Sequence, residues 1–170
     1  MDLIQSNGQP HYGRFSTLPK TIDLNKYQYK TPYGKVLTGW RKRLKYKKFK
    51  FCCIQHEHYT IGLAIADIAW AGHGFFYIYN HQRAEVLEWN AINFLSRHTT
   101  VDEQPLYNQS FFSKSPFQID IQHANGVRYI HVTKYGEIKL SARIFCAGTD
   151  ALSMCSPTGI NGWTYTQKLT

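Results

Sequence analysis

The fold is decided by residues 117–146, which read FQIDIQHANGVRYIHVTKYGEIKLSARIFC. The stretch opens with apolar and polar residues in strict alternation, which is the period-two pattern of a half-buried strand. Asn125-Gly126 follows, and this pair favours a two-residue hairpin because both central residues of a type I′ turn need a positive φ. That turn sets two apolar pairs on one side of the sheet: Ile121 opposite Ile130, and Ile119 opposite Val132. A shift of one residue would destroy the match, so the pattern fixes the register.

The same reasoning adds a third strand to this sheet. Lys134-Tyr135-Gly136 reads as a three-residue loop with its glycine in the left-handed conformation. The loop would place Val132 opposite Ile138 and Ile130 opposite Leu140, and it would align Asp120, His131 and Lys139 on the polar face. The stretch therefore predicts three neighbouring antiparallel strands.

The rest of the chain repeats the strand pattern. Further strands are expected at 46–54, 58–68, 73–80, 84–90 and 160–167, with no helix longer than about two turns. Residues 1–39 show little periodicity, so we expect an extended lead-in before a single β domain over 40–170. Many strands with short links predict an all-β antiparallel meander that closes into a barrel or forms a strongly twisted sheet or sandwich.

Length and cysteine content bound the class of protein. A chain of 170 residues fits one domain, and its 15% of aromatic residues favours strands. The four cysteines show no C-x-x-C spacing, so we expect reduced thiols and no structural zinc site. No secretory signal is visible, and no apolar run approaches the roughly 20 residues of a membrane helix. We therefore expect a cytoplasmic protein without a transmembrane segment.

Several spaced motifs resemble those of one family. They are Gly39-Trp40-Arg41, Tyr46 to Ile54, Ala66 to Phe75 (ADIAWAGHGF), Gly162 to Lys168 (GWTYTQK) and the less specific Tyr12 to Phe15. The set is similar to the N-terminal half of the family catalogued as domain of unknown function 2804. The resemblance touches most of residues 12–168.

This resemblance carries expectations of its own. Members of that family are usually near twice this length, so the chain would stop where a second β domain begins. By more distant analogy the family looks like the tandem lipocalin-like group that includes carotenoid hydratases and secreted lipid-active proteins. That analogy implies a lipocalin-like (calycin-like) barrel, but it transfers neither an activity nor a catalytic residue.

A basic run occupies residues 41–50, where seven Lys or Arg residues occur without an acid. The bases alternate with aromatic residues on a predicted strand, a pattern that can bind phosphate backbones or anionic membrane surfaces. Arg41, Arg43, Lys45 and Lys47 are the candidates for contact with an anionic partner. The simpler interpretation is an edge strand that lysines protect from pairing with other chains. Nucleic acid is not the partner we expect.

Two other polar groups also have simple structural interpretations. His56 and His58 would share a strand face, as metal ligands do, but they lie between two strands where polar turn residues belong. We therefore predict no metal and no other cofactor. Asp67 ends an apolar run before Trp70 and could act as an acid or base near a barrel mouth. Its simpler role is to accept backbone N–H bonds in the bend before Gly72.

The predicted function is binding of an apolar or amphipathic small molecule. Trp70, Tyr77, Tyr79 and Trp89 are the predicted lining residues, because a pocket needs apolar walls with a few polar groups. The motifs of common hydrolases and nucleotide-binding proteins do not occur. Two alternatives stay open. One is an enzyme acting on an isoprenoid-like or lipid-like substrate, and the other is an interaction domain that docks a second β domain or an anionic partner through strand 41–50.

Overall fold

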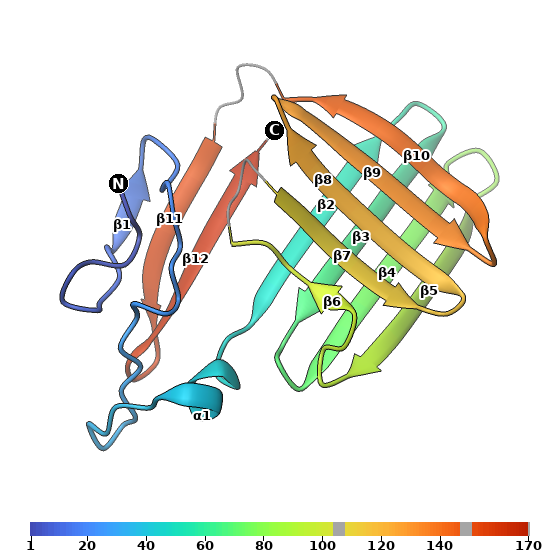
Figure 1. Cartoon of the computed structure of the whole chain (residues 1–170). Coiled ribbons are helices and arrows are strands. Elements are labelled where there is room, and N and C mark those ends of the chain that lie inside the picture. The colour runs from blue at the N-terminus through green and yellow to red at the C-terminus, as the bar shows by residue number, and fades with distance from the viewer. Residues whose placement is uncertain (104–107, 147–150, 170) are drawn as a thin grey trace.

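The structure is a computed structural model that describes residues 1–103, 108–146 and 151–169. Antiparallel strands in three sheets dominate this part of the chain, and its helix α1 (Gly39–Arg43) is short (Figure 1). The strands are β1 (Gly13–Phe15), β2 (Lys48–Gln55), β3 (Tyr59–Asp67), β4 (Ala71–Asn80), β5 (Glu85–Phe94), β6 (Thr99–Thr100), β7 (Asn108–Lys114), β8 (Phe117–Ala124), β9 (Val127–Lys134), β10 (Glu137–Phe145), β11 (Ala151–Thr158) and β12 (Gly162–Leu169). The prediction of an all-β antiparallel fold is confirmed.

Two of the sheets stack face to face as a sandwich (Figure 1). One sheet has the order β2-β3-β4-β5, and the other has the order β10-β9-β8-β7-β6. Strand pairing does not join these two sheets within the described residues, so no closed barrel forms there.

Side chains from both sheets fill the sandwich core. Its fully buried members include Leu63, Ile65, Phe76, Phe112, Ile119, Ile121, Ile130 and Val132. Burial of each such side chain stabilises the fold by about 1.5–3 kcal/mol relative to exposure. Gly74 leaves room for the Phe112 ring, since a Cβ built there would lie only 2.2 Å from a ring carbon.

The hairpin of β8 and β9 has the predicted register. Asn125 and Gly126 form its turn with φ of 52° and 73°. The ladder pairs Ile121 with Ile130 and Ile119 with Val132, as the alternation requires. This prediction is confirmed.

The predicted register between β9 and β10 is wrong. The turn has two residues, Tyr135 and Gly136, with φ of 55° and 77°, and a register shift follows between Ile138 and Leu140. Val132 therefore pairs with Leu140 instead of Ile138, and Ile130 pairs with Ala142 instead of Leu140; His131 faces Ser141 instead of Lys139. The two-residue turn pairs Ile138 with Thr133, on the face away from the core, and the Ile138 side chain is 68% exposed.

The remaining strand predictions differ mainly in extent. Strands β2 to β5 and β12 lie near the five predicted ranges, and β5 continues to Phe94 instead of ending at residue 90. Three strands, the two-residue β6 and the longer β7 and β11, fall where the pattern predicts none. Their inward positions include Ser110 and Ser153, which are buried although they are polar, so the alternation of apolar residues is weak there.

The third sheet has the order β1-β11-β12 and joins the two ends of the described chain. Its own small core contains Leu3, Ile4, Tyr27 and Cys155, with Trp163 and Tyr165 packed against it. The lead-in residues 1–39 thus lie beside β11 and β12, away from the sandwich interior (Figure 1).

The four cysteines are free thiols. Cys52 and Cys155 are buried, and burial raises the pKa of both thiols, for Cys155 to about 11. In the described part of the chain, no helix has the length and apolar character needed to cross a membrane.

Candidate binding cleft

Two hollows lie at the junction between the lead-in residues and the sandwich. Strand β2 leaves the sandwich at this junction and leads back to α1 (Figure 1). Two adjoining clefts open there, and both are lined by Lys26, Lys48 and Glu103. We call them the acidic cleft, of about 520 Å³, and the basic cleft, of about 910 Å³.

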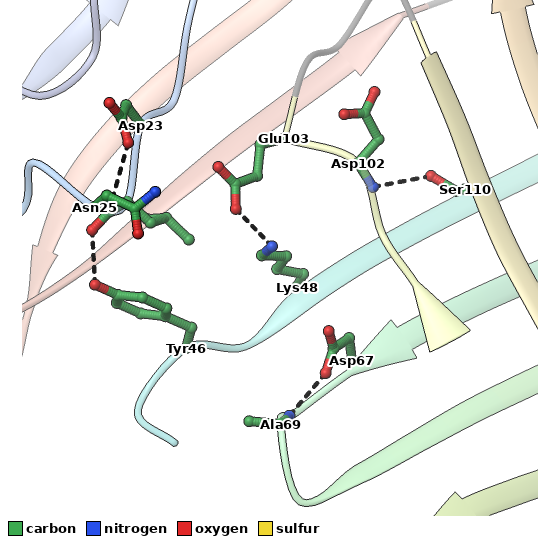
Figure 2. Close-up of polar contacts among 10 residues, drawn as sticks. Asp23, Asn25, Tyr46, Lys48, Asp67, Ala69, Asp102, Glu103 and Ser110 are labelled. Carbon is green, nitrogen blue, oxygen red and sulfur yellow. Dashed lines mark hydrogen bonds and ion pairs between the residues drawn. The ribbon is translucent and has the colours of Figure 1, made fainter. Parts of the chain in front are cut away.

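The acidic cleft carries more carboxylates than cations. Its charged lining residues are Asp2, Asp23, Asp102 and Glu103, with Lys26 and Lys48. Thr21 donates a hydrogen bond of 2.9 Å to Asp2, which holds the pKa of that carboxyl below its usual value, and Lys26 adds to the effect. The Asp102 backbone N–H donates to Ser110 Oγ over 3.1 Å (Figure 2).

The ion pair between Lys48 and Glu103 marks the boundary of the two clefts. Lys48 Nζ lies 2.6 Å from the Glu103 carboxylate, and both side chains are partly shielded from water (Figure 2). The pair links the start of β2 to the segment that follows β6. It thereby fixes one wall of the basic cleft.

The basic cleft combines cations with an apolar wall. Its cations are Lys26, Lys42, Arg43 and Lys48, and its apolar residues are Leu24, Tyr27, Val36, Leu37 and Tyr46. Lys42 Nζ donates a hydrogen bond of 2.8 Å to the backbone carbonyl of Asn25. Burial lowers the pKa of Lys42, and the nearby Asp23 opposes that shift. Within the described residues Arg43 forms no ion pair, so its guanidinium is available to a ligand.

Two tyrosines stiffen the wall of the basic cleft. Tyr46 donates its hydroxyl proton to the Leu24 carbonyl over 2.8 Å, and Tyr27 donates to the Asn161 carbonyl over 2.9 Å. Burial raises the pKa of both phenols, for Tyr46 to about 12. Both phenols therefore stay protonated and uncharged at ordinary pH.

The predicted basic strand 41–50 is only partly a strand. Residues 39–43 form α1, and β2 begins at Lys48, the residue that pairs with Asp67 at the end of β3. The basic residues before Lys48 lie beyond the end of β3 and pair with no strand among the described residues. Of the four predicted anion contacts, Arg43 lines the basic cleft, whereas Arg41, Lys45 and Lys47 are exposed outside it.

The alternating pattern did not single out two cleft cations. Lys42 and Lys48 line the basic cleft, but a continuous strand would place them on the opposite face from the predicted contacts. The helical turn at α1 removes that alternation. Gly39, which lies just before the basic run and has a φ of 59°, is the residue that could have indicated a turn at this place.

The predicted aromatic lining residues do not come together at one site. Trp89 stacks on Phe76 of the sandwich core with ring centroids 5.3 Å apart. Tyr77 and Tyr79 lie on β4 and point to the opposite face of the same sheet. Trp70 is 57% exposed in the turn between β3 and β4.

Asp67 has a structural role in that turn. Its Oδ1 atom accepts the Ala69 N–H over 2.8 Å and the Ser96 hydroxyl over 2.6 Å. Ala69 has a φ of 68°, a left-handed conformation that an alanine rarely adopts, so the carboxylate stabilises the turn at this position (Figure 2). The simpler of the two predicted roles therefore accounts for these contacts.

The two histidines of the β2–β3 turn lie close together. The rings of His56 and His58 are 5.7 Å apart at their centroids, and Gln82 lies within hydrogen-bond distance of His58. Over the described ranges, no group of three or more His, Cys, Asp or Glu residues is arranged to hold a metal ion.

Together these features define an all-β sandwich chain with a cleft of mixed charge and apolar character beside the sandwich. The chain belongs to the family described as a domain of unknown function, DUF2804, whose model matches residues 2–170. The family assignment from the spaced motifs is therefore confirmed. No curated protein and no solved structure matches the chain in the other two comparisons.

Proposed function

We propose that the protein is a small-molecule binding module whose basic cleft takes an amphipathic molecule with an anionic head group. The observation that carries this proposal is the combination of four cations with an apolar wall in one hollow of about 910 Å³. Ligand sites commonly pair apolar walls with a few polar groups that fix the orientation of the ligand.

The positions of the charged residues in the basic cleft predict the orientation of the ligand. Arg43 and Lys42 come from α1, and no carboxylate is paired with either of them among the described residues. A phosphate or carboxylate group would supply the missing partner, and a guanidinium can bind such a group in bidentate fashion. The tail of the ligand would then lie against Leu24, Tyr27 and Leu37, which line the same cleft.

The lipocalin-like relationship and a cytoplasmic location belong to this proposal as well. A small-molecule carrier fits the lipocalin-like analogy, although the cleft lies beside the sandwich and not between its sheets. The four free thiols favour a reducing compartment. Asp67 is engaged in a turn, so the proposal rests on the cleft and includes no catalytic group.

Calorimetric titration with dodecyl phosphate and with dodecanol tests the proposal. We expect binding of the phosphate and much weaker binding of the alcohol, since only the phosphate provides a partner for Arg43. A hydrogen bond to a charged group contributes about 1.5–3 kcal/mol. Because ~1.4 kcal/mol corresponds to tenfold, Arg43→Gln should weaken binding about tenfold or more.

Lys45→Gln is the matched control for this titration. It removes the same charge from the same basic run, but Lys45 is exposed and does not line the cleft. Its affinity for dodecyl phosphate should equal that of the unmodified protein. Equal binding of phosphate and alcohol, or equal losses for the two variants, would contradict the proposal.

A further inference from the structure

The segment that leads into the sandwich, including its first strand β2, is strongly basic. Residues 24–56 contain ten Lys or Arg residues and no Asp or Glu. Seven of these bases have exposed side chains. One of them, Lys26, lines both clefts, and the other six are Lys30, Lys35, Arg41, Arg43, Lys45 and Lys47. They belong to α1, to the residues that lead from it to β2, and to the loop of residues 30–36.

Exposed apolar side chains share this part of the surface. Trp40 is 68% exposed and Leu44 is 40% exposed. These two residues lie four positions apart in helical conformation, because the Leu44 N–H donates to the Trp40 carbonyl over 3.0 Å, so their side chains share one side of α1. Tyr33 is 97% exposed in the loop of residues 30–36.

The loop and α1 lie at the same end of the molecule. Figure 1 shows the loop directly beside α1, and Val36 lines the basic cleft together with Gly39 and Arg43. We call this surface the α1 face; it comprises Tyr33, Val36, Trp40 and Leu44 with the six exposed bases.

We propose that the α1 face docks the protein onto an anionic lipid bilayer. Tryptophan side chains favour the membrane–water interface, and aliphatic side chains such as Leu44 insert among acyl chains. Each basic residue near an anionic membrane adds roughly a fivefold gain in partitioning. The six exposed bases give this face a positive charge that is complementary to an anionic lipid surface, and residues 24–56 contribute no acid to it.

The mixed apolar composition favours a bilayer over a nucleic acid. Single-stranded nucleic acids bind to aromatic platforms on which bases stack. The Arg41 guanidinium lies over one face of the Trp40 ring, 5.4 Å from its centroid, and two of the four apolar residues of the α1 face, Val36 and Leu44, have no ring. The inference goes beyond the proposed ligand and does not depend on it, since the α1 face would dock whether or not the cleft is filled.

Co-sedimentation with vesicles tests this inference. The vesicles contain phosphatidylcholine alone or phosphatidylcholine mixed with phosphatidylserine, at low and at high salt. We expect binding only to the mixed vesicles and loss of that binding at high salt, because exposed charges are screened. Neutral vesicles that bind equally well would overturn the proposal.

Two variants keep all four cations of the basic cleft. A loss of vesicle binding in these variants is therefore distinguishable from a loss of ligand binding in the cleft. The variant with Arg41, Lys45 and Lys47 changed to Gln should bind on the order of a hundredfold less well, from about fivefold per charge. Trp40→Ala combined with Leu44→Ala should also abolish sedimentation. Both variants should still bind dodecyl phosphate.

Matched controls come from other exposed positions. The first control variant changes Arg14, Lys20 and Arg83 to Gln, which removes the same number of charges. The second control, Phe145→Ala, removes an aromatic ring that is 72% exposed on β10. Both control variants should sediment like the unmodified protein. Equal loss in the controls would overturn the proposal. Tighter binding of a labelled single-stranded oligonucleotide than of the mixed vesicles, unaffected by Trp40→Ala with Leu44→Ala, would overturn it in favour of a nucleic-acid partner.

Discussion

Replacing Phe112 with alanine should lower the free energy of unfolding by about 3–5 kcal/mol, the range for a large aromatic residue removed from a packed core. Phe112 is fully buried at the centre of the sandwich and contacts both sheets, since its ring lies over Gly74 of β4 and 6.0 Å from the ring of Phe117. Urea denaturation followed by tryptophan fluorescence would measure the change. The neighbouring Phe111 is only partly buried, so Phe111→Ala should cost clearly less.

A double-mutant cycle sharpens this prediction. Gly74→Ala should destabilise the unmodified protein, because the new Cβ would lie 2.2 Å from the Phe112 ring. In the Phe112→Ala background the ring is gone, so the same glycine substitution should cost much less. Strictly additive losses would show that the ring does not occupy the space above Gly74.

Replacing Leu3 with alanine should lower the stability of the small core that packs against the third sheet by about 2–5 kcal/mol, the range for a buried leucine. Leu3 is fully buried against Tyr27 and Cys155, and its core is separate from that of the sandwich. Hydrogen exchange should accelerate in β11 and β12 and remain slow in β8 and β9. This pattern would show that residues near the N-terminus hold the C-terminal hairpin in place.

The control for this prediction is Leu152→Ala. Leu152 lies on β11 itself but is 47% exposed, so its removal should change exchange in the third sheet only slightly. If Leu3→Ala accelerated exchange equally in β8 and β9, the two cores would form one cooperative unit, contrary to the separation described above.

The hairpin of β8 and β9 was predictable because local and long-range signals agree there. Asn125-Gly126 selects the turn, and the apolar alternation on either side admits only one register. The next turn is ambiguous from sequence because Tyr135-Gly136 fits both a two-residue and a three-residue loop. A tyrosine with positive φ is rare, so sequence favoured the longer loop, and the register shift before Leu140 has no local signal.

Sequence periodicity could not have predicted the cleft. It forms where the lead-in residues pack beside β12 and where α1 interrupts the basic run, and both events depend on contacts between distant parts of the chain. Tyr27 shows this most clearly, because its hydroxyl donates to Asn161, a residue 134 positions away. The basic run itself was visible in the sequence, and the cluster of cations at the cleft comes from it.

The most direct test of the account is an NMR titration that locates a bound amphipathic anion. Amide shifts on addition of dodecyl phosphate should change for Leu24, Leu37 and Arg43 and stay constant for Ile121 and Ile130 at the centre of the sandwich. Changes centred on Ile121 and Ile130, with none around Arg43, would place the ligand between the sheets and contradict a binding cleft at the junction.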